Sequence, residues 1–213
     1  MISMEKLFWN KEKTRGSFDL LHKLAKEVDF VLIGGWAVYF YVRQQESLDV
    51  DIAIRYDKID YFKRFGVSQY ESMKIKYSII DNIYVDMFLT EFSDKELPIP
   101  VSKILKNYIK IDGVKVVEKE MLLLLKLWGY FRNDEVKVRK DIIDVISLLF
   151  YGDVDLYRFK NLVKSCGVEK RRSTDVLLEY LDKGETLLEY IGIDGKEYAA
   201  RRKEYKNRIN EIS

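Results

Sequence analysis

The sequence contains few of the residues that cross-link proteins or bind soft metals. Its 213 residues include one cysteine, Cys166, and one histidine, His22. A lone cysteine excludes an internal disulfide and a cysteine-rich zinc site, and it fits a reducing, intracellular compartment. A lone histidine excludes a histidine-rich metal site. We expect Cys166 to pack as a small apolar residue and His22 to lie partly exposed on a surface helix.

Long hydrophobic runs and a large excess of one charge are also missing. The longest apolar run, Met121–Leu125, is far shorter than the roughly 20 residues of a membrane span. Met1–Asn10 lacks the apolar core of a signal peptide. Because 37 basic residues nearly balance 35 acidic ones, binding to nucleic acid would need a local patch. These features predict a cytoplasmic protein that does not enter a membrane.

The composition predicts a folded protein whose two halves differ in type. Hydrophobic residues make up 47% of the chain and aromatic residues 14%, which argues against disorder. Strand and helix patterns are mixed up to about residue 117, and the pattern is helical from Glu118 onward. We therefore predict an α+β fold with a mixed sheet in a domain at 1–117 and a helical domain at 118–213.

A glycine pair follows the first buried strand. Phe30–Ile33 is a continuous apolar run, Gly34 and Gly35 end it, and Trp36–Gln45 reads as a mostly buried helix. Glycine lets a ligand approach the backbone closely, and the N-terminus of the next helix favours an anion such as a triphosphate. The alternative is a purely structural turn, since many strand-to-helix connections use glycine.

Three aspartates are predicted on two neighbouring strands. Leu48–Ile54 alternates, so Asp49 and Asp51 point to the same face with α-carbons roughly 6.5 Å apart. Asp86 lies in Ile83–Leu89, which is predicted to form a hairpin with an earlier strand. Such carboxylates can converge on Mg2+, which prefers hard oxygen ligands. The alternative is a solvated acidic face, but aspartate is a poor strand former, and clustered carboxylates repel one another.

The remaining elements are predicted from caps, turns and periodicity. Ser17 is expected to be the N-cap of the first helix. The other predicted helices are Asp57–Phe65, Ser102–Ile109, Met121–Phe131, Asp141–Tyr151, Leu156–Lys164, Thr174–Leu181 and Glu197–Ile212. The other predicted strands are Lys74–Ile80, before the Asp81-Asn82 turn, and Val114–Val117, after the Asp112-Gly113 turn.

The order Gly34-Gly35, Asp49-Val50-Asp51 and then Asp86 resembles the nucleotidyltransferase superfamily with the polymerase-β-like core. The resemblance implies that Asp49, Asp51 and Asp86 are catalytic and hold two Mg2+ ions. It also implies that Gly34 and Gly35 contact the phosphates of a nucleoside triphosphate. Ser47 occupies the position of a threonine that the family often carries, and it can supply the same hydroxyl for nucleotide binding. The family's arginine is replaced by Gln45, and Arg43 lies two residues early.

The helical half is similar to the AbiEii-type nucleotidyltransferases, the toxins of certain toxin–antitoxin pairs. The residues that carry this similarity are Lys126 and the segment Arg139-Lys140-Asp141-Ile142-Ile143-Asp144. The resemblance implies that Lys126 touches the nucleotide phosphates and that Asp141 positions a group near the active centre. The alternative is that Lys126 is a solvated helix residue, with Asp141 and Asp144 capping or pairing on a helix surface.

The function implied is Mg2+-dependent transfer of a nucleoside monophosphate from a triphosphate to an acceptor hydroxyl. The resemblance implies an RNA acceptor, with tRNA as the main candidate, and an antitoxin protein as a partner. The basic residues within Arg201–Arg208 could bind an RNA backbone, although the glutamates among them favour an exposed, salt-bridged helix. Two alternatives stay open: a non-catalytic module that binds a nucleotide or a partner, and a small-molecule nucleotidyltransferase.

Overall fold

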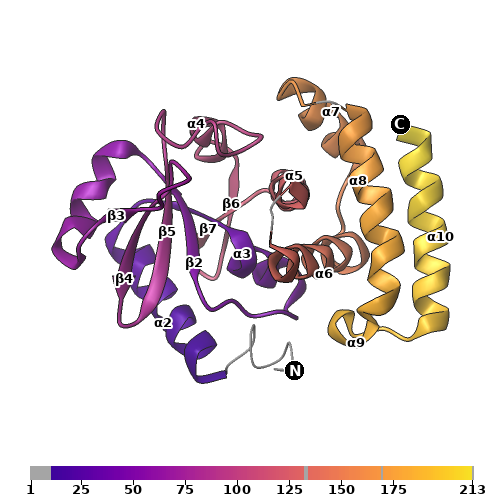
Figure 1. Cartoon of the computed structure of the whole chain (residues 1–213), viewed down its shortest axis with the longest axis horizontal. Helices are drawn as coiled ribbons and strands as arrows, with labels where there is room; N and C mark the ends of the chain where they lie inside the picture. The colour runs from indigo at the N-terminus through magenta and orange to yellow at the C-terminus, as the bar shows by residue number, and fades with distance from the viewer. Residues whose placement is uncertain (1–10, 132–133, 169, 213) are drawn as a thin grey trace. The chain divides into compact units, whose positions relative to one another are not determined.

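The computed structural model describes residues 11–131, 134–168 and 170–212 (Figure 1). The chain divides into two compact units, Met1–Glu118 and Lys119–Ser213. The first unit contains a mixed seven-stranded sheet with helices, and the described elements of the second are helical. The predicted α+β fold is therefore confirmed. The prediction that Met1–Asn10 is no signal peptide falls outside the described residues.

The elements of the first unit are α2 (Lys11–Glu27), β1 (Val31–Ile33), α3 (Gly34–Val42), β2 (Val50–Ile54), η1 (Tyr56–Phe65), β3 (Ser68–Gln69), β4 (Lys76–Ile80), β5 (Ile83–Leu89), α4 (Val101–Ile104), β6 (Tyr108–Ile111) and β7 (Val114–Val117). Those of the second unit are α5 (Lys119–Trp128), η2 (Gly129–Phe131), α6 (Glu135–Tyr151), α7 (Leu156–Ser165), α8 (Lys170–Lys183), η3 (Gly184–Thr186), α9 (Leu188–Ile191) and α10 (Gly195–Ile212). Within the described residues, no helix combines the length and apolar character that a membrane span requires.

The sheet has the strand order β3-β4-β5-β2-β1-β7-β6. The central pairs β2–β5 and β1–β7 are parallel, whereas β1–β2, β3–β4, β4–β5 and β6–β7 are antiparallel. All three residues of β1 are buried, as expected for a central strand of a sheet with covered faces. The mixture of pairings places β2 between the glycine turn that follows β1 and the strand that carries Asp86.

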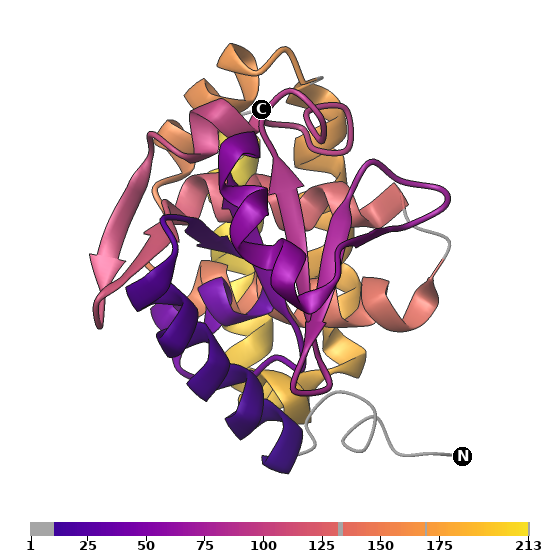
Figure 2. The same ribbon diagram turned by 90° about the vertical axis from the view of Figure 1, so that its left-hand side faces the viewer.

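One face of the β4–β5 hairpin is covered by α2 and η1, which lie together on one side of the sheet (Figure 2). Ser78 of β4 donates its hydroxyl to the carbonyl of Gly66, at the end of η1. The predicted two-residue turn is confirmed, since Asp81 and Asn82 join the strands with φ values of 51° and 63°. Positive φ at both positions matches the right-handed twist of a hairpin, and Asn and Asp tolerate it.

Two predictions of local structure were wrong. Ser17 is not an N-cap, because α2 already includes Lys11, and the side chain of Ser17 is buried. Its hydroxyl lies 3.0 Å from the carbonyl of Thr14 and 2.6 Å from that of Ser47. The predicted helix over Ser102–Ile109 stops at Ile104, and Ile109 belongs to β6. Pairing with β7 explains this difference, because it supplies the backbone hydrogen bonds of β6 from a different segment.

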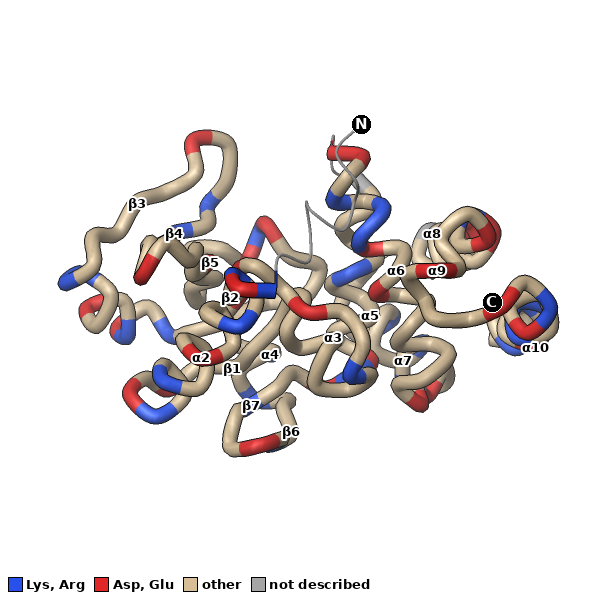
Figure 3. Tube along the Cα trace, turned by 90° about the horizontal axis from the view of Figure 1, so that it is seen from below, with Lys and Arg blue, Asp and Glu red and all other residues tan. Residues whose placement is uncertain are grey.

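The last helix of the second unit, α10, carries residues of both charges (Figure 3). Arg201 pairs with Glu197 at 2.8 Å, and Arg208 lies 3.6 Å from Glu204. Arg202 and Lys206 reach Glu185 and Asp182 of the preceding segments, at 2.7 and 2.6 Å. The sequence left two interpretations of the basic residues in this helix, an RNA-binding tail and a salt-bridged helix, and the interleaved glutamates favoured the second. The ion pairs agree with the salt-bridged helix.

Candidate metal centre

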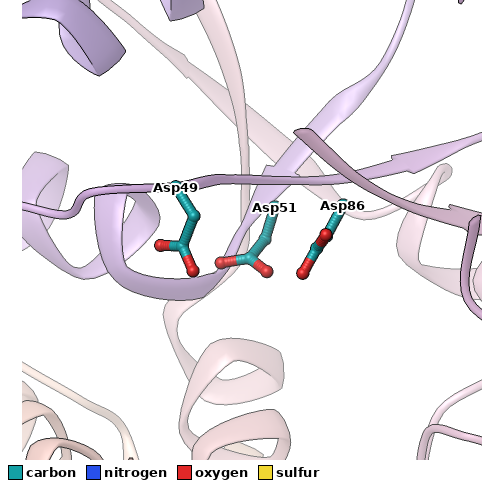
Figure 4. Close-up of side chains that lie close together, drawn as sticks. All are labelled: Asp49, Asp51 and Asp86. Carbon is teal, nitrogen blue, oxygen red and sulfur yellow. The ribbon is translucent and has the colours of Figure 1, made fainter. Parts of the chain in front are cut away.

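The carboxylates of Asp49, Asp51 and Asp86 converge on one face of the paired strands β2 and β5 (Figure 4). One oxygen of each lies within 4.8 Å of the others, and all three side chains are half-buried. Hard carboxylate oxygens at this spacing are the donors that Mg2+ and similar cations prefer. The three aspartates could therefore hold a metal ion.

The parallel pairing of β2 with β5 brings two of these aspartates together. Asp51 and Asp86 are direct partners in the ladder, so their side chains leave the same face of the sheet side by side. Asp49 lies immediately before β2, two residues from Asp51, and points in the same direction (Figure 4). The predicted face is thus correct, although the strand is two residues shorter than expected.

Ser47 orients the carboxylate of Asp49 through a hydrogen bond. The Ser47 hydroxyl donates to Oδ1 of Asp49 at 2.6 Å, and Ser47 is fully buried. Its carbonyl accepts the hydroxyl of Ser17, whose oxygen in turn accepts the indole N–H of Trp36 at 3.1 Å. This chain of hydrogen bonds ties the segment before β2 to α2 and α3. Whether Ser47 also contacts a nucleotide stays a prediction.

Tyr70 holds Asp86 in a similar way, and sequence reasoning did not identify it. Its hydroxyl donates to Oδ1 of Asp86 at 2.8 Å. Burial and the nearby Asp86 carboxylate raise the pKa of Tyr70 far above its usual value, so the phenol stays protonated and remains a donor. Tyr70 lies in the irregular segment between β3 and β4. No periodic pattern in that segment indicates which residues its side chain contacts.

Gly34 lies directly beside Asp51. A β-carbon built on Gly34 would come within 1.9 Å of Oδ2 of Asp51, and the φ of Gly34 is 72°. Both observations require glycine, since any side chain would displace the carboxylate and strain the backbone. Gly35 is buried in the first turn of α3. The turn therefore places the N-terminal amides of α3 close to the aspartates, where the helix dipole favours an anion.

Arg43 points to a different partner. It follows α3 in the left-handed conformation, with φ 56°, and pairs with Asp112 of the β6–β7 turn at 2.7 Å. Its guanidinium also lies over the rings of Tyr39 and Phe40. These contacts account for the arginine without a role at the aspartates.

Within the helical unit, Lys126 of α5 contacts two aspartates of α6. Its Nζ lies 2.7 Å from Asp144 and 3.1 Å from Asp141. The side chains are 11%, 1% and 4% exposed for Lys126, Asp144 and Asp141. The alternative of a solvated lysine with surface aspartates is therefore wrong, because all three side chains are buried. That Lys126 touches phosphates and that Asp141 serves the active centre stay predictions.

The comparisons with known proteins identify no relative. A scan against protein-family models, a search of curated proteins and a search of solved structures each returned no match. The geometry of the three aspartates and their surroundings is therefore the basis for any functional conclusion.

Proposed function

We propose that this chain is a Mg2+-dependent nucleotidyltransferase. It would move a nucleoside monophosphate from a nucleoside triphosphate to an acceptor hydroxyl, with an RNA end, and tRNA in particular, as the acceptor. The single observation that carries the proposal is the convergence of Asp49, Asp51 and Asp86 within 4.8 Å. Its position beside the Gly34 turn supports a phosphate ligand.

Asp49, Asp51 and Asp86 would hold the two magnesium ions of the proposed reaction, and Asp86 would lie nearest the acceptor. Bound Mg2+ would lower the pKa of the acceptor hydroxyl and neutralise charge on the departing pyrophosphate. In the reaction the acceptor oxygen forms a bond to the α-phosphorus, and the bond to pyrophosphate breaks. The hydroxyl proton leaves toward Asp86 or solvent.

The protein contributes positioning rather than covalent chemistry. Ser47 fixes the orientation of Asp49, and Tyr70 fixes that of Asp86. Gly34 leaves room for the Asp51 carboxylate, and the α3 N-terminus would direct amide groups toward a negative ligand. Each of these residues therefore acts on a group that the proposed reaction needs.

The test is a transfer assay with purified protein, Mg2+, total RNA and each of the four α-labelled nucleoside triphosphates. We expect label in RNA that depends on Mg2+ and is abolished by a chelator. Transfer to tRNA over other RNA would support the narrower acceptor. Absence of transfer with all four triphosphates would contradict the enzyme.

The same materials distinguish the alternatives. Calorimetric titration with Mg2+ and triphosphates that shows binding without turnover would indicate a non-catalytic module. Transfer to a small hydroxyl compound but not to RNA would indicate a small-molecule nucleotidyltransferase. A toxin role predicts that expression of the intact protein arrests bacterial growth, that the Asp51→Asn variant does not, and that an antitoxin relieves the arrest.

A further inference from the structure

Three tyrosines form a row beside the aspartates. Tyr70 and Tyr77 have ring centroids 4.6 Å apart with an interplanar angle of 32°, and Tyr77 and Tyr84 are 5.6 Å apart at 36°. Tyr70 lies before β4, Tyr77 on β4 and Tyr84 on β5. We call Tyr70, Tyr77 and Tyr84 the tyrosine row.

The tyrosine row starts at the candidate metal centre and leads away from it. Tyr70 donates its hydroxyl to Asp86, and Tyr77 is the direct partner of Asp86 across the β4–β5 ladder. Tyr84 lies two residues before Asp86, so the two side chains leave the same face of β5. The row therefore shares a face with the aspartates and runs toward the hairpin turn.

The outer end of the row is open. Tyr84 is 46% exposed, and Ile79, its direct partner on β4, is 45% exposed. Residues of the opposite face of the hairpin, such as Ser78, Ile80 and Val85, are buried. An aromatic ring and an aliphatic side chain thus form an apolar surface that continues from the tyrosines nearest Asp86.

The strand order separates this surface from the glycine turn. The order β4-β5-β2-β1 places the tyrosine row on one flank of β2 and Gly34, which follows β1, on the other. A triphosphate bound at Gly34 and Gly35 would therefore lie across the aspartates from the tyrosines. The group that approaches from the tyrosine side is then the acceptor.

We propose that the open ring of Tyr84, which packs on Tyr77 and through it on Tyr70, stacks an unpaired base at the end of a single-stranded RNA and so brings its terminal hydroxyl toward Asp86. This inference rests on the proposed function, since it names the binding site of the acceptor. Aromatic rings bind single-stranded nucleic acid because every base has a flat face, which makes the contact strong and tolerant of sequence. The occupant is thus an unpaired RNA end of any sequence.

The test measures binding without turnover. A short, dye-labelled single-stranded RNA is titrated with the whole protein in Mg2+ and without triphosphate, and fluorescence anisotropy is recorded. We expect Tyr84→Ala to weaken binding about 5- to 150-fold, the range of one lost stacking contact. Tyr84→Phe, which keeps the ring, should bind within about twofold of the original chain. Tyr157→Ala, at a 64% exposed tyrosine of α7, is the matched control and should change nothing.

Kinetic readouts distinguish this subsite from a structural role. Tyr84→Ala should raise the KM for RNA and leave the KM for the triphosphate unchanged, with an unaltered circular dichroism spectrum. Unchanged RNA binding by Tyr84→Ala would overturn the inference. So would an equal loss of triphosphate binding, which would mean that the tyrosines hold the incoming base, or equal binding of a blunt duplex. Ring-dependent RNA binding without any transfer would instead contradict the proposed function and leave the RNA subsite supported.

Discussion

Each unit of the protein contains a cluster of carboxylates, and the two clusters differ in how their negative charge is compensated. In the helical unit, Asp141 and Asp144 are buried around the Lys126 ammonium. In the sheet unit, Asp49, Asp51 and Asp86 are half-buried and lie within reach of a single metal ion. One cluster contains its own cation, and the other is built from donors that suit an external one. The first cluster is thus balanced by a cation of its own unit, whereas the second could hold a metal ion.

The largest expected effect is on activity. Asp51→Asn should lower nucleotidyl transfer at least about 1,000-fold, since a neutral amide is a poor ligand for Mg2+. Its free energy of unfolding should stay equal or rise slightly, because one source of carboxylate repulsion is removed. Transfer assays and urea unfolding would measure both. An unfolded variant would show that Asp51 is structural, which would erase the contrast between the two clusters.

The next effect is on stability. Lys126→Met removes the cation from a buried cluster and should lower the free energy of unfolding by about 3–5 kcal/mol. Adding Asp141→Asn and Asp144→Asn to that variant should restore much of the loss, because no uncompensated charge remains. Urea unfolding at neutral pH measures both. A loss below about 1 kcal/mol would show that Lys126 is not needed for the fold and would favour its predicted role at the nucleotide.

A smaller effect concerns pH. Burial raises the pKa of Asp144 above its ordinary value, and the Lys126 ammonium opposes that rise. The native state then holds this proton more tightly than the unfolded chain, so the associated stability is present below about pH 4 and is lost as the pH rises. Asp144→Asn should remove this component, which amounts to at most about 1.4 kcal/mol per pH unit. The measurement is the free energy of unfolding as a function of pH for the original chain and for Asp144→Asn. The same slope in both proteins would mean that Asp144 stays ionised in the native state and would contradict the prediction.

The smallest effect concerns the support of Asp49. Ser47→Ala removes one buried hydroxyl donor and should cost about 1 kcal/mol of stability, with weaker metal binding because Asp49 loses its fixed orientation. Ser165→Ala is the matched control, since that exposed hydroxyl donates to the carbonyl of Leu162 within its own helix. It should change stability by less than about 0.5 kcal/mol. Equal effects of the two substitutions would mean that Ser47 does not position Asp49.

Features with local causes were predictable from the sequence. Asp81-Asn82 encodes its turn through residues that accept positive φ, so the hairpin was predicted. The alternation around Asp49 and Asp51 likewise determines their common face. The order of the motifs then led to Asp86 as the third carboxylate, and the pairing of β2 with β5 brings it to the other two.

Features that depend on distant partners were not predictable. From the sequence, Ser17 is a good N-cap residue. In the structure its hydroxyl instead donates to the carbonyl of Ser47 and accepts the indole N–H of Trp36, two residues that are distant in the sequence. The contact of Tyr70 with Asp86 depends on the path of an irregular segment, which no periodicity describes. The burial of Lys126 between two aspartates depends on the packing of α5 against α6, which spacing along one helix does not reveal.

The parallel register of β2 and β5 has a consequence for how the protein folds. Parallel strands cannot be joined by a tight turn, so this pairing closes a long loop and forms slowly. A slip of one residue would send Asp86 to the opposite face from Asp51. The three carboxylates therefore come together only once this long-range pairing has formed in the correct register. The ability to bind a metal ion is acquired at the same step of folding as the native strand order.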